Sequence, residues 1–175
     1  MEWNWTDFVL IGVLLVCAAT DAARRKIYNV VVFPALALAV AGHLATGGWA
    51  AAGLSMLGLF AGLSLLLIPY LMGGMGAGDV KLLAVVGALK GAAFAADAAI
   101  YMALTGFLLS VVFLLPRPAF RRFLLYAAYT VISWRPGSNL RVPRHGGALH
   151  ATMPYGIAIA CGALAALFWR GVVQG

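Results

Sequence analysis

Long apolar runs, separated by short polar or glycine-rich stretches, make up most of the chain. Six runs can be distinguished, at residues 8–21, 30–45, 51–71, 80–96, 98–115 and 153–169. Crossing a bilayer takes about 17–25 mainly apolar residues, so the shorter runs need their flanking residues at the hydrocarbon edge. The pattern predicts an all-α, polytopic integral membrane protein with six transmembrane helices. Because only Asp97 separates the fourth run from the fifth, five spans are the alternative.

Composition supports a membrane protein and changes how the charge is interpreted. Hydrophobic residues make up 64% of the chain and charged residues 10%, whereas soluble domains carry about 25% charged residues. The net charge of +7 would suggest nucleic acid as the partner of a soluble protein. In a membrane protein it instead predicts loops that face anionic lipid headgroups, and no nucleic acid.

The positive charges predict an orientation. Ten of the twelve Lys and Arg residues lie in alternate connections between the runs: Arg24, Arg25, Lys26, Lys81, Arg117, Arg121, Arg122, Arg135, Arg141 and Arg144. Positively charged loops stay on the cytoplasmic side, so both termini are expected on the outer side. Asp21 and Asp79 then fall at the same, cytoplasmic, membrane face.

One long connection, residues 116–150, lies between the fifth and sixth runs. Its aromatic and basic stretch at 120–134 is too short to span a bilayer. This region is expected to be either a basic cytoplasmic loop or a helix lying in the membrane interface. Without internal repeats, residues 1–175 are expected to form a single transmembrane domain.

The acidic residues are few, and two of them adjoin other unusual features. Asp79 follows a glycine-rich stretch, where it suits either a helix cap or a functional site. Asp21 precedes a basic cluster, so an ion pair with Arg24 or Arg25 on the same helix is the plain interpretation. Two carboxylates at one membrane face also suit general acid–base hydrolysis, in which one is ionised and the other protonated. Spacing alone does not show that they meet.

Three stretches together resemble the type IV prepilin peptidase family of GxGD membrane aspartyl proteases. They are Asp21…Arg24…Ile27-Tyr28-Asn29, then Gly76-Ala77-Gly78-Asp79-Val80-Lys81, and Met153-Pro154-Tyr155-Gly156. The resemblance implies that Asp21 and Asp79 are the catalytic pair. Substrate-proximal or loop-shaping roles are expected for further residues of these stretches: Arg24, Asn29, Gly76, Gly78, Lys81 and Pro154. Tyr28 departs from the family pattern, which usually has proline at this position.

The short length before the first run and the absence of a CxxC pair resemble the peptidase-only branch linked to Flp/Tad pili. The resemblance implies an aspartic endopeptidase of the bacterial inner membrane, without N-methyltransferase activity. It would remove the basic leader of prepilins or pseudopilins at the cytoplasmic face, with pilus assembly machinery as a further partner. Neither a cofactor nor a metal is expected. The alternatives are a small transporter or channel subunit that binds cations or protons at Asp21 and Asp79, and a non-catalytic assembly scaffold.

The remaining polar residues have simpler interpretations. Lys81 is expected to face lipid headgroups or to pair with a carboxylate. His43 is expected at the outer interface, and Asp97 is expected to cap or interrupt a helix there. His145 and His150 lie in the basic connection, where two histidines alone do not complete a zinc site.

Overall fold

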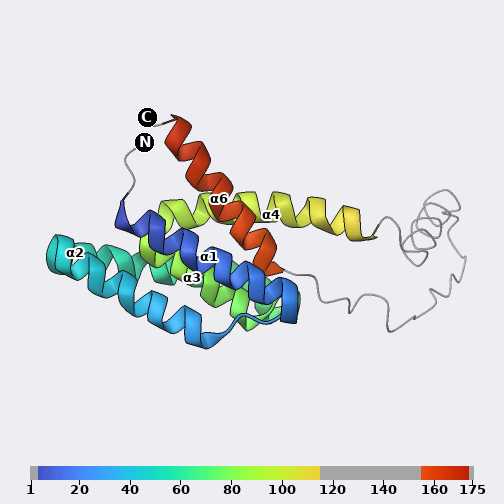
Figure 1. Cartoon of the computed structure of the whole chain (residues 1–175), viewed down its shortest axis with the longest axis horizontal. Helices are drawn as coiled ribbons and strands as arrows, with labels where there is room; N and C mark the ends of the chain where they lie inside the picture. The colour runs from blue at the N-terminus through green and yellow to red at the C-terminus, as the bar shows by residue number, and fades with distance from the viewer. Residues whose placement is uncertain (1–3, 115–154, 174–175) are drawn as a thin grey trace, which may run out of the picture. The chain divides into compact units, whose positions relative to one another are not determined.

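The computed structural model describes residues 4–114 and 155–173, which are helical apart from short connections (Figure 1). The helices are α1 (Trp5–Arg24), α2 (Asn29–Leu71), α3 (Ala77–Lys90), α4 (Ala92–Leu114) and α6 (Tyr155–Val173). The chain divides into two compact units, residues 1–106 with 154–175 and residues 107–153, and the contacts below lie in the first. The predicted loop or interfacial helix at 116–150 falls outside the described residues, and the single domain stays a prediction.

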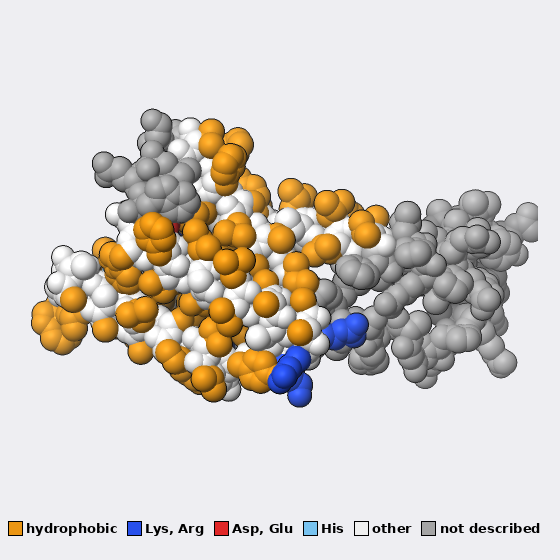
Figure 2. Space-filling view, in the orientation of Figure 1, with side chains coloured by type: hydrophobic (Ala, Val, Ile, Leu, Met, Phe, Trp, Pro, Cys, Tyr) orange, Lys and Arg blue, Asp and Glu red, His pale blue; other side chains and the backbone are white. Residues whose placement is uncertain are grey.

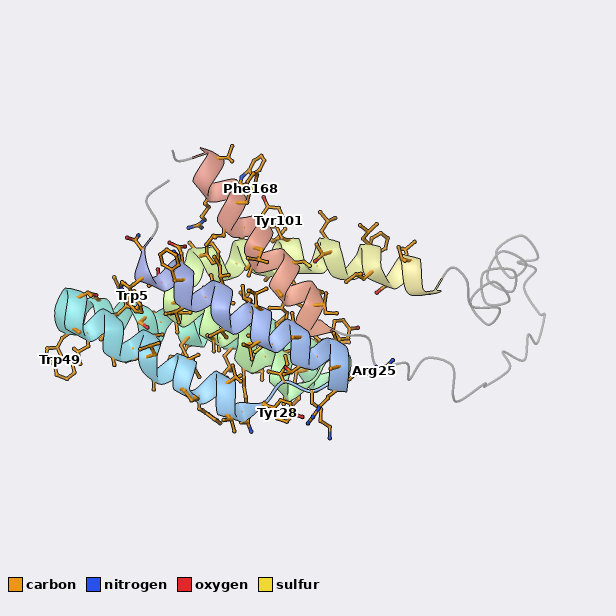
Figure 3. All side chains as sticks on the ribbon, in the orientation of Figure 1. Trp5, Arg25, Tyr28, Trp49, Tyr101 and Phe168 are labelled. Carbon is orange, nitrogen blue, oxygen red and sulfur yellow. The ribbon has the colours of Figure 1, made fainter. Side chains whose placement is uncertain are left out.

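α2 is interrupted at Gly48, whose backbone is not helical, with φ 67° and ψ −162°. Glycine adopts a positive φ without the steric cost that a side chain brings. The two arms on either side, residues 29–47 and 49–71, correspond to the second and third predicted runs. Figure 1 shows the arms meeting at one end of α2, where Figure 3 labels the exposed Trp49.

The two arms of α2 run in opposite directions along α3. Four contacting pairs show this: Asn29 with Lys81 and His43 with Leu89 along the first arm, Gly58 with Gly87 and Gly62 with Leu83 along the second. Residue numbers rise together in the first two pairs and oppositely in the last two. The chain therefore folds back at Gly48, and α2 is a helical hairpin with both arms against α3.

Four helices within the described residues are long and apolar enough to cross a membrane: α1, α2, residues 92–112 of α4 and residues 155–172 of α6. α3 differs, because 14 residues extend only about 21 Å, which is less than the roughly 30 Å of a hydrocarbon core. Most of α3 is buried among the other helices. The described residues are thus all-helical with four candidate membrane spans, whereas six spans and the outward-facing termini stay predictions.

The predicted boundary between the fourth and fifth runs is wrong. α3 ends at Lys90, and Gly91 (φ 88°) separates it from α4, which begins at Ala92. Asp97 therefore neither caps nor interrupts a helix. It lies within α4, where its Oδ2 accepts hydrogen bonds from Nε and Nη2 of Arg170, at 2.8 and 2.6 Å.

Apolar side chains are spread over the whole described part of the face shown in Figure 2, as expected of helices that contact lipid. Lys and Arg side chains on this face gather at the end of α1, where Figure 3 labels Arg25. Trp5, at the start of α1, lies at the other end of that helix (Figure 3). The charged end of α1 is also the end that carries Asp21.

Candidate active site

Asp21 is buried in the last turn of α1, with 6% of its surface exposed. Its Oδ2 accepts a hydrogen bond from the backbone N–H of Gly156 at 2.9 Å, and the N–H of Ile157 is a second backbone partner. Gly156 and Ile157 belong to the first turn of α6, where N–H groups have no partner within their own helix. The carboxylate thus caps α6, and the positive end of that helix favours a negative charge at this point.

Asp79 is buried in the first turn of α3, with 8% of its surface exposed. Its Oδ2 accepts the backbone N–H of Gly76 at 3.1 Å, while its own N–H donates to the Gly76 carbonyl at 3.1 Å. Asp79 is not the N-cap residue of α3, which is Gly76; from the third position of the helix, its carboxylate instead caps the N–H of Gly76. The cap uses Oδ2 of the carboxylate and holds the side chain in a fixed position at the start of α3.

The two acids lie at the same end of α1 and α3, close enough for their charges to interact. Asp79 precedes the apolar part of α3 and lies outside the four candidate spans. Burial raises its pKa to about 6; the hydrogen bond from Gly76 opposes this shift and the nearby charge of Asp21 adds to it. Spacing along the sequence does not show that the helix ends carrying Asp21 and Asp79 lie near each other. The structure places them at the same end of α1 and α3.

The glycine-rich stretch that leads into the first turn of α3 leaves space in two places. Of its glycines, Gly73 has a positive φ of 75°, whereas Gly76 is extended with φ −81°. A Cβ at Gly76 would lie 3.2 Å from Oδ2 of Asp79, and one at Gly78 would lie 2.9 Å from Cβ of Ile27. Gly76 therefore leaves room for the carboxylate, and Gly78 lets the start of α3 approach the connection between α1 and α2.

Lys81 and Asn29 form the polar rim beside the acids. Nζ of Lys81 donates to Oδ1 of Asn29 at 3.0 Å and lies 5.3 Å from the centre of the Phe33 ring. This bond joins the first turn of α2 to the first turn of α3. Lys81 thus binds the amide oxygen of Asn29 and not a carboxylate, which was one of the two predicted partners. The other prediction, that Lys81 faces lipid headgroups, stays a prediction.

Arg24 has a different partner from the one that helical spacing suggested. Its Nη1 donates to the hydroxyl of Tyr28 at 3.1 Å, whereas Asp21 accepts its hydrogen bonds from α6. Tyr28 is the residue just before α2, in an extended conformation with φ −85° and ψ 132°. Tyr28, which departs from the family pattern, thus has an extended backbone and provides a hydroxyl group that binds Arg24.

The remaining candidates lie elsewhere or outside the described residues. Nε2 of His43 is 3.1 Å from the carbonyl oxygen of Leu89, at the far end of α3 from Asp79. Pro154, His145 and His150 lie outside the described residues. Within the described part of the chain, no three His, Cys, Asp or Glu residues are grouped as metal ligands would be.

Gly156 is the site residue that sequence reasoning did not single out. A Cβ there would lie 2.8 Å from Oδ2 and 2.9 Å from Cγ of Asp21, so the residue has no room for a larger side chain. A local feature of the sequence does mark this residue, because Gly156 ends the Pro-Tyr-Gly stretch at the start of the last apolar run. Its contact with Asp21 joins residues far apart in the chain, and no local pattern reports such a contact.

Comparison with known protein families gives one match. The model of the type IV leader peptidase family matches residues 8–115, which include both acids and the connections that carry them. Comparisons with curated proteins and with solved structures found no match. The match covers more than half of the chain, and the chain therefore belongs to the type IV leader peptidase family.

Proposed function

We propose that this protein is a membrane-embedded aspartyl endopeptidase that removes the basic leader of type IV, Flp-like prepilins or pseudopilins. Asp21 and Asp79 form its catalytic pair. The observation that carries the proposal is the placement of two buried, electrostatically interacting carboxylates at one end of adjacent helices. The family match supports a leader-peptidase-like protease in general, and the identity of the pair and of the substrate are the further steps proposed.

The reaction needs one ionised and one protonated carboxyl group. The ionised carboxylate takes a proton from a water molecule as the water oxygen attacks the scissile carbonyl carbon. The protonated carboxyl group donates a hydrogen bond to the carbonyl oxygen and stabilises the tetrahedral intermediate. Transfer of a proton to the leaving amide nitrogen then breaks the C–N bond. Like charges held close together in a buried site favour this division of protons between the two groups.

The location of the pair suits a substrate whose basic leader is followed directly by an apolar helix. The acids lie at helix ends, beside the exposed cations Arg24 and Lys26 and the partly exposed Lys81. Cations in this position favour the layer of anionic headgroups. A basic leader would bind the same headgroups, and its apolar helix would continue into the bilayer, so that the bond between them lies at the depth of the carboxylates.

The distribution of charge supports a cytoplasmic location for the site in a bacterial inner membrane. Two cations, Lys90 and Arg170, lie where the sequence predicts the outer side. Lys90 forms an ion pair with Asp7, and Arg170 forms one with Asp97. The positive-inside rule counts Lys and Arg rather than net charge, and among the described residues four of these cations lie at the end that carries the acids and two at the other end. The cations beside the catalytic pair thus remain the stronger orientation signal among the described residues.

Co-expression with a Flp-type prepilin tests the proposal. Wild type, Asp21→Asn and Asp79→Asn are compared on a gel for the mobility shift that accompanies loss of the leader, at matched protein levels in the membrane. Wild type should produce the shift and both variants should lose it. Wild-type processing by Asp79→Asn would contradict the catalytic pair. If the wild type cleaves none of several prepilins, ion flux through the protein is the next measurement.

A further inference from the structure

A second buried polar cluster lies at the opposite ends of α1 and α3 from the catalytic pair. Oδ1 of Asp7 and Nζ of Lys90 are 2.6 Å apart, and their side chains are only 9% and 17% exposed. The other carboxylate oxygen, Oδ2, accepts the backbone N–H of Asn4 at 2.9 Å. The family match and the catalytic pair assign no role to this ion pair.

Each member of the ion pair shares a helix with one of the two acids. Asp7 and Asp21 lie on α1, about 21 Å apart along the helix axis, and Lys90 and Asp79 lie on α3, about 16 Å apart. The two helices are therefore antiparallel, with the ion pair at one end and the carboxylates at the other. The ion pair and the two acids are therefore linked through the same two helices.

Different contacts hold α3 against α2. The hydroxyl of Ser55 donates to the carbonyl of Ala88 at 2.8 Å, and the backbones of Gly58 and Gly87 approach closely. These contacts set the position of α3 relative to the α2 hairpin. The bond between Asp7 and Lys90 instead joins α3 directly to α1. It therefore constrains the relative placement of the two helices that carry the carboxylates.

We infer that the Asp7–Lys90 ion pair positions α1 against α3 and so sets the separation of the Asp21 and Asp79 carboxylates. Asp7 and Lys90 are positioning residues, which act on the reaction through the placement of the acids. Because the ion pair is buried, removal of one partner leaves an uncompensated charge that must reach water or another partner. The ends of α1 and α3 then separate. The effect on activity rests on the proposed function, whereas the effect on geometry does not.

Cross-linking measures the geometry without any activity. The parent carries Asp21→Cys and Asp79→Cys, with Cys17→Ala and Cys161→Ala to remove the native thiols. A short bis-maleimide is applied in membranes, and mass spectrometry gives the yield of the 21–79 cross-link per molecule. Asp7→Asn is expected to lower this yield several-fold, and the exchanged pair Asp7→Lys/Lys90→Asp is expected to restore most of it. Asp97→Asn is the matched control, because it breaks an ion pair between α4 and α6 and should leave the yield unchanged.

Processing by variants with intact catalytic acids provides the second readout. Asp7→Asn should lower kcat more than it raises KM, and the exchanged pair should recover much of kcat. An unchanged cross-link yield in Asp7→Asn, or a loss of activity that only follows the amount of protein in the membrane, would overturn the inference. The absence of a cross-link in the parent would overturn it as well. If the wild type cleaves no prepilin while Asp7→Asn still lowers the yield, the proposed function fails and the positioning role stands.

Discussion

The backbone N–H of Gly156 donates to Oδ2 of Asp21 at 2.9 Å, so that the first turn of α6 closes over the last turn of α1. Two ends of the chain that are far apart in sequence thereby share one buried carboxylate. This contact fixes the orientation of Asp21 through the backbone, and it depends on a residue without a side chain.

Gly156→Ala is predicted to lower activity while both proposed catalytic groups, Asp21 and Asp79, are retained. The added Cβ would lie 2.8 Å from Oδ2 of Asp21, so the carboxylate must move away from its position. Displacement of a catalytic group by about 1 Å can lower a rate about a hundredfold. The measurement is kcat for prepilin cleavage in detergent, at matched amounts of protein.

Gly12→Ala is the control for this substitution, since a Cβ at Gly12 in α1 meets nothing within 4 Å. It should process prepilin at the wild-type rate. Equal rates for Gly156→Ala and Gly12→Ala would show that the contact with α6 does not hold Asp21 in its active orientation.

Gly62→Ala is predicted to destabilise the protein through the packing of α2 on α3. A Cβ at Gly62 would overlap the carbonyl of Leu83, so the two helices must separate. Overpacking of this kind costs about 1–3 kcal/mol. Unfolding by sodium dodecyl sulphate in mixed micelles would measure the loss. Gly53→Ala, on the same arm of α2 with open space around it, should unfold like the wild type, and equal values for the two variants would contradict close packing at Gly62.

The helices and the end of the molecule at which the acids lie were predictable from sequence, because hydrophobic runs and clustered cations are local patterns. The break at Gly48 also falls between two predicted runs. The boundary at Gly91 was missed, although Lys90 followed by glycine is a typical helix end. An acid between two apolar runs also suggests a break, but Asp97 pairs with Arg170 on another helix, a contact that no local pattern indicates.

The two acids of the candidate site could be proposed from the sequence, whereas the residues that contact them could not. Motif residues identified Asp21 and Asp79, since such motifs are short and local. The partners of the acids are of two kinds: Gly76 is three residues from Asp79, whereas Gly156 contacts Asp21 from the other end of the chain. Contacts of the second kind arise from helix packing, and a single sequence contains no local signal for them.

Asp97→Asn is predicted to process prepilin at close to the wild-type rate. The ion pair that it breaks is 32% exposed at Arg170 and 42% exposed at Asp97, and exposed pairs contribute about 0–1 kcal/mol. Neither residue lies on a helix that carries Asp21 or Asp79. The gel-shift assay at matched membrane levels checks this outcome. A large loss of processing would contradict the placement of Asp97 away from the site.

Lys81 and Asn29 are predicted to act as one unit that joins the starts of α2 and α3. If the 3.0 Å bond between them is what each residue contributes, removing either partner removes the whole effect. Lys81→Met and Asn29→Ala should therefore each slow processing modestly, and the double variant should be no slower than the slower single variant. The initial rates of the four proteins form a double-mutant cycle. If the two losses multiply in the double variant, the residues act independently, and a separate contact of Lys81 with substrate or lipid headgroups would then account for its effect.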